Sequence, residues 1–201
     1  MPVSRESPHV SRDERRRRTE QAILEAAREA FATDGYERTT IRAVASSAGV
    51  DPALVMQYFG SKEGLFAEAA RWPEDTSTAV TAPRDELAVA ALRDVLERFE
   101  GAGADREAAV ALMRSCLTHP EATRIVRDEV MCDRMAAMAR TIGGDDGDLR
   151  AGLLVACVMG LSMSRHVLGV EPVASASRED LERLLEPALR ALVQGAGADE
   201  G

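Results

Sequence analysis

The sequence predicts an all-α protein, with a small N-terminal three-helix domain, a larger helical domain after it, and about nine helices in total. Hydrophobic residues make up 45% of the 201 residues but aromatic residues only 3%. Ala, Leu, Val and Met must therefore fill the core, and this composition favours helices over sheets. Apolar residues recur at helical spacing between glycine-containing separators, and strand-like alternation is absent.

The net charge of −9 is unevenly distributed along the chain. Of its 25 basic and 34 acidic residues, 11 of each lie in Met1–Trp72, so the remaining 14 basic and 23 acidic residues carry the whole imbalance. One end can therefore approach a polyanion while the other is repelled by it.

Composition also sets expectations for the location of the chain. Met1–Arg18 contains no apolar run typical of a signal peptide, and the longest uncharged stretch, Ala151–Ser164, is too short to span a bilayer. The mean hydropathy is −0.18, and three cysteines, an odd number, form no CxxC pair. We expect a cytoplasmic protein with reduced thiols and no membrane partner.

The first element after the polar N-terminus is a helix over Thr19–Thr33, with Ile23, Ala27 and Phe31 on one face, and Asp34-Gly35 ends it. Residues 1–18 form a flexible basic arm in this prediction. The run Arg15–Arg18 is either a solvated helix start or a segment that rests on phosphates or enters a minor groove.

Two short helices follow. Thr40 is a good N-cap for a helix containing Val44 and Ala45, and Gly49 supplies a turn residue with positive φ. Asp51-Pro52 then begins a helix to Phe59, and Ser61 caps a further helix to about Trp72. Two short helices joined by a tight glycine turn form a helix-turn-helix.

Residues 39–66 resemble the DNA-binding signature of the tetracycline-repressor (TetR) family; they read TTIRAVASSAGVDPALVMQYFGSKEGLF. The preceding AILEAAREAFATDGYERTT is similar to that family's first helix. The resemblance implies a DNA-binding domain at 19–72 and a ligand-binding and dimerisation domain at 73–201. It further implies a homodimeric repressor that binds double-stranded palindromic operator DNA and is released by a small-molecule effector, without a cofactor.

In this family the helix corresponding to Pro52–Phe59 enters the major groove, so Ala53, Met56 and Gln57 are expected to face bases. Gln57 can make two hydrogen bonds to adenine, and the other two can contact thymine methyl groups. The resemblance implies that Tyr58 and Lys62 contact the DNA backbone. Thr40 lies at a helix N-terminus suited to a phosphate, and Arg42 is a candidate for a further base or phosphate contact. The predicted DNA-binding residues are Thr40, Arg42, Ala53, Met56, Gln57, Tyr58 and Lys62.

Long helices are expected at about 84–100, 106–118, 122–142, 148–168 and 178–194. Two stripes are candidates for the dimer interface, because small residues at four-residue spacing let helices approach closely and leucines form an apolar face. The candidates are Gly152, Ala156, Gly160 and Ser164, and then Leu181, Leu185, Leu189 and Leu192. Burial inside one subunit is the alternative.

Methionine-rich segments of the second domain suggest an adaptable ligand cavity, although ordinary core packing explains them too. The candidate ligand-binding residues are Met113, Cys116, Met131, Met135, Met159, Met163 and His166.

Three other classes of protein were considered. A redox- or metal-responsive regulator could use Cys116 and Cys132 with His119, although the spacing is irregular. An enzyme is disfavoured because GxSxG, HExxH and phosphate-loop motifs are absent, so no catalytic or metal-binding residue is assigned. The turn chemistry argues against a helical protein-interaction module.

Overall fold

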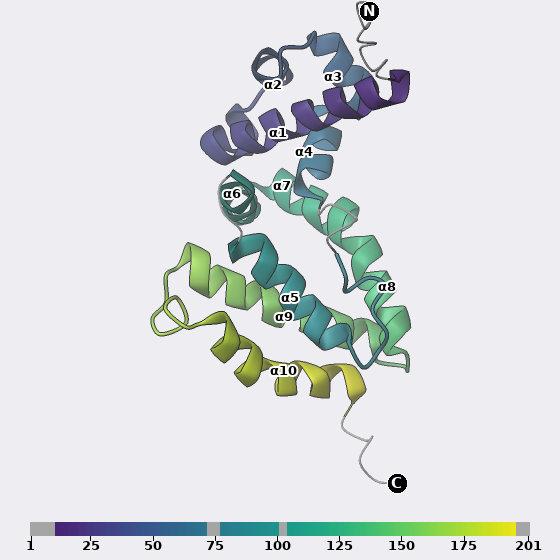
Figure 1. The fold of residues 1–201 in the computed structure, drawn as a ribbon, viewed down its shortest axis with the longest axis vertical. Coiled ribbons are helices and arrows are strands. Elements are labelled where there is room, and N and C mark those ends of the chain that lie inside the picture. Colours follow the sequence, from purple (N-terminus) through teal and green to yellow (C-terminus); the bar gives the residue numbers. More distant parts are fainter. Residues whose placement is uncertain (1–10, 72–76, 101–103, 196–201) are drawn as a thin grey trace, which may run out of the picture.

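The structure is a computed structural model that describes residues 11–71, 77–100 and 104–195. These residues form nine continuous helices and no strand, which confirms the predicted all-α class (Figure 1). The helices are α1 (Arg12–Arg38), α2 (Ile41–Ser47), α3 (Pro52–Phe59), α4 (Lys62–Ala70), α5 (Leu87–Glu100) and α6 (Ala104–Thr118), then α7 (Pro120–Ile125) continuing through the π-helical η2 (Val126–Met131) into α8 (Cys132–Ile142), α9 (Gly147–Ser162) continuing into η3 (Met163–Val167), and α10 (Arg178–Gln194).

Helix α1 begins earlier than predicted. It begins at Arg12 because Ser11 caps it: the Ser11 hydroxyl accepts a hydrogen bond from the Glu14 amide, 3.1 Å away. Gly35, with a φ of 77° and a ψ of 171°, is not helical and kinks α1 after Asp34, where the sequence predicts that the helix ends. The expected start at Thr19 is therefore wrong, and the arginines of the predicted arm lie in the first turns of α1. Residues 1–10 of that arm lie outside the described residues.

The helix-turn-helix forms as the sequence predicts. The side chains of Thr40, Asp51 and Ser61 accept hydrogen bonds from backbone amides at the starts of α2, α3 and α4, at 3.1, 2.7 and 3.0 Å. Gly49 between α2 and α3 has a φ of 66°, which favours glycine. These caps set where each of the three helices begins.

The core of this N-terminal domain extends into the second domain. Phe66 packs edge-on against Phe31 and Tyr36, with ring centroids 4.9 and 4.8 Å apart. The same buried cluster includes Leu112 of α6 and Ile125 of α7. The predicted boundary at 72–73 is therefore not a boundary in packing.

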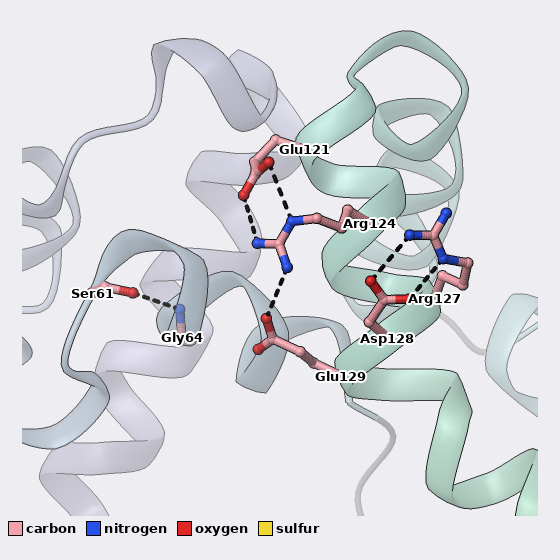
Figure 2. A network of polar contacts seen from close by, with 7 residues as sticks. All are labelled: Ser61, Gly64, Glu121, Arg124, Arg127, Asp128 and Glu129. Atoms are coloured by element: carbon pink, nitrogen blue, oxygen red, sulfur yellow. Dashed lines mark hydrogen bonds and ion pairs between the residues drawn. The ribbon is translucent and has the colours of Figure 1, made fainter.

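Polar contacts also join the two domains. His119 Nδ1, at the start of α7, lies 3.3 Å from the Glu37 carboxylate of α1. Figure 2 shows Arg124 between Glu121 and Glu129, at 2.6 and 3.8 Å, beside the capped turn at Ser61. The segment α7–η2 thus carries a charged network next to α4.

The segment after α4 is anchored to α5 by a buried carboxylate. Asp94, 3% exposed, accepts four hydrogen bonds of 2.7–3.1 Å: two from Thr78 and one each from the Ser77 hydroxyl and the Ala79 amide. Because a buried charge is costly unless it is hydrogen-bonded, these contacts hold residues 77–79 in place.

Helices α5, α9 and α10 pack against one another at the end of the molecule opposite α1–α3 (Figure 1). The continuous helix Gly147–Val167 is long and apolar enough to cross a membrane by length and composition alone, and 28% of its most apolar window is buried. A core helix of a soluble protein passes the same test.

Candidate nucleic-acid interface and internal cavity

Helix α3 presents a short exposed face. Val55 is fully buried and anchors the helix to the domain core, while Ala53, Met56 and Gln57 are exposed. Leu54 and Phe59 are half-buried on the inward side of the helix. The three predicted base-reading residues therefore lie together on the solvent side of α3.

A basic hollow of about 590 Å³ lies between the start of α1 and α3. Its α3 wall includes Gln57 and Tyr58, and the Arg16 guanidinium lies 5.5 Å from the centre of the Tyr58 ring. The α1 residues that line it are Arg12, Asp13, Arg15, Arg16 and Thr19. Arg12 is not among the predicted DNA-binding residues, because a helix that starts at Thr19 does not place Arg12 on one face with Arg15 and Arg16.

The other predicted DNA contacts surround α3. Thr40 and Arg42 are exposed at the start of α2, and a helix N-terminus favours a nearby anion. Lys62 is half-buried: its ammonium donates to the Glu37 carbonyl oxygen at 3.0 Å and lies 4.6 Å from the centre of the Tyr36 ring. Lys62 is therefore held against α1 rather than free in solvent.

A cavity of about 100 Å³, partly open to solvent, lies where α4, α5, α6, η2, α8 and α9 meet. Its apolar wall includes four predicted ligand residues, Met113, Cys116, Met131 and Met159. Arg98 and Arg134, which sequence reasoning missed, also line it. No sequence signal distinguished these two arginines from the other arginines on α5 and α8.

The remaining predicted ligand residues lie elsewhere. Met135 packs beside Gly152 of α9, and Met163 packs against the core of the second domain. His166 stacks on Phe99, with ring centroids 5.5 Å apart. These three residues are not among those that line the cavity.

The predicted dimer stripes divide into buried and exposed parts. Leu181 and Leu189 are 7% and 1% exposed and lie in the core of their own chain, while Leu185 and Leu192 are half-buried. Ala156 and Gly160 are exposed, and Gly152 and Ser164 are half-buried. Large apolar side chains are instead exposed at Leu149, Leu153 and Leu184, at 65%, 42% and 65%.

Sequence comparison places both parts of the chain in one family. Residues 23–69 match the family described as "Bacterial regulatory proteins, tetR family", and residues 85–193 match "Tetracyclin repressor-like, C-terminal domain". The chain belongs to the TetR family.

Two curated relatives in the TetR family are similar to part of the chain. The transcriptional repressor AcnR of Corynebacterium glutamicum is 36% identical over 77 residues, which cover 38% of this chain and 40% of AcnR. A helix-turn-helix repressor of Mycobacterium tuberculosis is 34% identical over 89 residues, which cover 44% of this chain and 46% of that protein. The matches thus span less than half the length of these relatives.

Solved TetR-family structures resemble the whole fold. A TetR-family regulator from Streptomyces coelicolor has a TM-score of 0.61 at 28% identity, covering 96% of this chain and 100% of that chain. NalD of Pseudomonas aeruginosa, a repressor of a multidrug efflux pump, has a TM-score of 0.62 at 24% identity, covering 92% and 100%.

The redox and metal alternatives gain no support from the geometry of this TetR-family chain. Burial raises the pKa of Cys116 to about 11, so its thiol stays protonated and unreactive at neutral pH. Within the described ranges no group of three or more His, Cys, Asp or Glu side chains is placed to hold a metal ion.

Proposed function

We propose that this TetR-family chain is a homodimeric transcriptional repressor that binds palindromic DNA and is released by a small molecule. One observation carries the proposal: the exposed face of α3, with Gln57, lies beside Arg12, Arg15 and Arg16 at the start of α1. A helix whose exposed face offers one amide side chain and two apolar side chains, with cations beside it, suits a major groove between its phosphates.

Gln57 reads sequence in this proposal, because its amide can bond an adenine edge bidentately, and Ala53 and Met56 contact thymine methyl groups. Arg12, Arg15 and Arg16 neutralise phosphates on one side of the groove. Thr40, Arg42, Tyr58 and Lys62 provide the remaining backbone contacts. The acidic excess after Trp72 keeps the second domain away from the DNA.

Dimerisation buries the exposed apolar faces of α9 and α10. Leu149, Leu153, Ala156 and Gly160 follow one another at helical spacing on α9, and Leu184 and Ala188 do so on α10. A two-fold axis through this surface sets the two α3 helices about 34 Å apart, one turn of DNA. The low burial of α9 in the single chain supports this interface, and a DNA-bound role implies a cytoplasmic location.

Release follows from the shared packing of the two domains. Val130 lines the cavity and belongs to the same buried cluster as Phe66 of α4. A ligand that prefers a reshaped cavity therefore shifts the population toward a second state of the dimer. In that state the separation of the two DNA-binding domains no longer matches the separation of the two half-sites.

Selection from a random duplex library with the purified chain tests the proposal. The expected product is a palindrome whose half-sites lie about one helical turn apart. Gln57→Ala should reduce discrimination for that palindrome about tenfold, whereas Gln194→Ala, an exposed glutamine at the end of α10, should not. Failure to enrich any duplex at low salt would refute the proposal.

A further inference from the structure

We propose that the cavity of about 100 Å³ beside α4, α6 and η2 binds a small uncharged aromatic molecule with a single ring. This deepens the proposed function, because it names the chemical class of the small-molecule effector. It rests on that function only for the effect on DNA binding.

The wall of the cavity is predominantly apolar. Apart from Arg98, Arg134 and Cys116, every residue that lines it is apolar, and none of the described residues in the wall is acidic. Burial raises the pKa of Cys116 to about 11, so its thiol carries no charge at neutral pH. An ammonium group that entered this space would lose its hydration and meet no carboxylate, so the cavity excludes organic cations.

The two arginines in the wall are held by other parts of the protein. Arg98 donates a hydrogen bond to the Ala70 carbonyl oxygen at 3.3 Å, and the Arg134 guanidinium lies 3.8 Å from the Asp94 carboxylate. Both side chains also make further interactions within the chain. A carboxylate ligand would have to displace these partners after giving up its own hydration, so the cavity disfavours anions as well. An uncharged ligand avoids both costs.

Sulfur atoms and an aromatic ring distinguish this wall from an ordinary aliphatic one. Thioethers come from Met113 on α6, Met131 on η2 and Met159 on α9. The ring is that of Phe99 on α5. Thioethers make favourable contacts with aromatic rings, and aromatic rings pack well against one another. Four such groups from four different elements favour a flat aromatic ring over an aliphatic chain of the same size.

The volume limits the ligand to one ring. At about 100 Å³ the cavity is smaller than the roughly 150 Å³ of an engineered cavity that holds benzene. Methionine side chains are unbranched and flexible, so the three thioethers can move to accept a six-membered ring. Two fused rings would require the surrounding helices to shift, because packed interiors resist expansion.

The cavity borders the end of α4, which connects it to the helix-turn-helix. Ala70, in the last turn of α4, and Leu112 of α6 both line it and belong to the same buried cluster as Phe66. A ring that enlarges the cavity would shift Ala70 relative to Leu112 and so move α4 within this cluster. Binding of the ring and release of DNA are coupled in this way.

Calorimetry on the purified, DNA-free chain tests the ligand class with toluene, benzoate and benzylamine, which share a single ring and differ in charge. Toluene should bind roughly tenfold or more tightly than either ion. Indole, an uncharged molecule with two fused rings, should bind roughly tenfold more weakly than toluene. Absence of toluene binding, or equal or tighter binding of either ion, would overturn the proposal. Tighter binding of indole would overturn the limit to one ring.

Cys116 reports whether toluene occupies this cavity. Its thiol lines the cavity and is half-buried, whereas Cys132 on α8 is exposed and does not line it. N-ethylmaleimide labels both thiols at about pH 9, where part of the Cys116 thiol ionises. Toluene at about ten times its Kd should slow labelling of Cys116 roughly tenfold and leave Cys132 unchanged, as measured by peptide mass spectrometry. Unchanged labelling of Cys116, or equal slowing at both thiols, would place toluene elsewhere.

Matched variants test the role of sulfur. Met113→Leu and Met159→Leu conserve volume and remove a thioether, so each should weaken toluene binding about threefold. Met138→Leu, at a buried methionine on α8 that does not line the cavity, should leave toluene binding unchanged. Circular dichroism checks the fold of each variant. Unchanged toluene affinity in both the Met113→Leu and Met159→Leu variants would overturn the aromatic class.

A second pair of variants tests the space itself. Ala109→Leu fills the cavity from α6 and should abolish toluene binding, whereas Ala111→Leu, at a half-buried position of the same helix outside the cavity, should not. Unchanged toluene binding in a folded Ala109→Leu variant would overturn the assigned site. If Ala109→Leu does not fold, the labelling of Cys116 still decides the site.

Adding toluene to the chain bound to its selected duplex separates the two proposals. Toluene should lower the affinity for the duplex about tenfold, and an unchanged affinity would refute the role of this ligand class as effector. Binding of toluene with no enrichment of DNA would refute the proposed function alone. Enrichment of DNA without toluene binding would refute the ligand class alone.

Discussion

The Lys62 ammonium donates a hydrogen bond to the Glu37 backbone carbonyl oxygen, 3.0 Å away, and so ties the start of α4 to the end of α1. One of its three N–H donors is used there, which leaves the group able to bond a phosphate as well. Lys62→Met keeps the packing over Tyr36 and removes the charge. The slope of log affinity against log salt should fall in magnitude by about 0.9. Arg71→Met, at the far end of α4, is the control and should not change the slope. An unchanged slope in Lys62→Met would make this lysine purely structural.

Gly64 allows α4 to pack closely against the end of α3. A Cβ atom at this position would lie 2.2 Å from the Phe59 carbonyl oxygen, a backbone atom that cannot move without shifting α3. Gly64→Ala should therefore lower the free energy of unfolding by about 2 kcal/mol, measured by urea denaturation at fixed chain concentration.

Gly152→Ala is the matched control for Gly64→Ala, since its Cβ would meet only the Met135 methyl group, at 3.7 Å. It should be neutral or stabilise the helix by up to about 1 kcal/mol. Equal stability of the Gly64→Ala and wild-type proteins would show that α3 and α4 can separate freely.

Asp94→Asn tests the anchor of the segment after α4. The amide retains one oxygen, so the bonds that the Ser77 hydroxyl and the Ala79 amide donate to the second oxygen are lost. Unfolding free energy should fall by about 3 kcal/mol, because these are hydrogen bonds to a buried charge. Asp133→Asn, an exposed aspartate on α8, changes the net charge equally and should have little effect. A loss of less than about 0.5 kcal/mol would contradict the anchoring role.

Leu184→Glu tests the α9–α10 interface. Leu184 is 65% exposed in the single chain, so the change should leave the subunit folded but place charge in the dimer contact. Sedimentation should show a monomer, and affinity for the palindrome should fall. Leu117→Glu, at a 59% exposed leucine on α6, should remain dimeric. If Leu184→Glu sediments as a dimer, the interface lies on another surface.

His166 makes stability depend on pH. Burial against Phe99, with Arg106 and Arg165 nearby, lowers the pKa of His166 in the folded chain. The unfolded chain therefore binds the proton more readily, and stability should fall as pH drops through about 6.5. His166→Gln should lose less stability than the wild type between pH 7 and pH 5, measured as the shift in urea midpoint. Parallel losses in the two proteins would assign the pH dependence to other groups.

Local signals predicted most of the helix-turn-helix. The caps at Thr40, Asp51 and Ser61 act between neighbours in sequence, and each forms as expected. The early start of α1 carried a similar signal, Ser11 followed by Glu14, which was overlooked.

Features that depend on contacts between helices distant in sequence could not be predicted from local sequence signals. Leu181 and Leu184 are both leucines on one amphipathic helix, yet one is buried and the other exposed, because only the placement of α5 and α9 decides which side is covered. The pairing of Arg98 with Ala70 and of Arg134 with Asp94 likewise depends on helices far apart in sequence.

The hydrophobic cluster that runs from Phe66 through Leu112 to Ile125 has a practical meaning for protein engineering. A fragment cut after Trp72 would lack Leu112 and Ile125, which belong to the same buried cluster as Phe66. A chimera that exchanges the second domain between relatives must therefore preserve the contacts that Leu112 and Ile125 make with the DNA-binding domain.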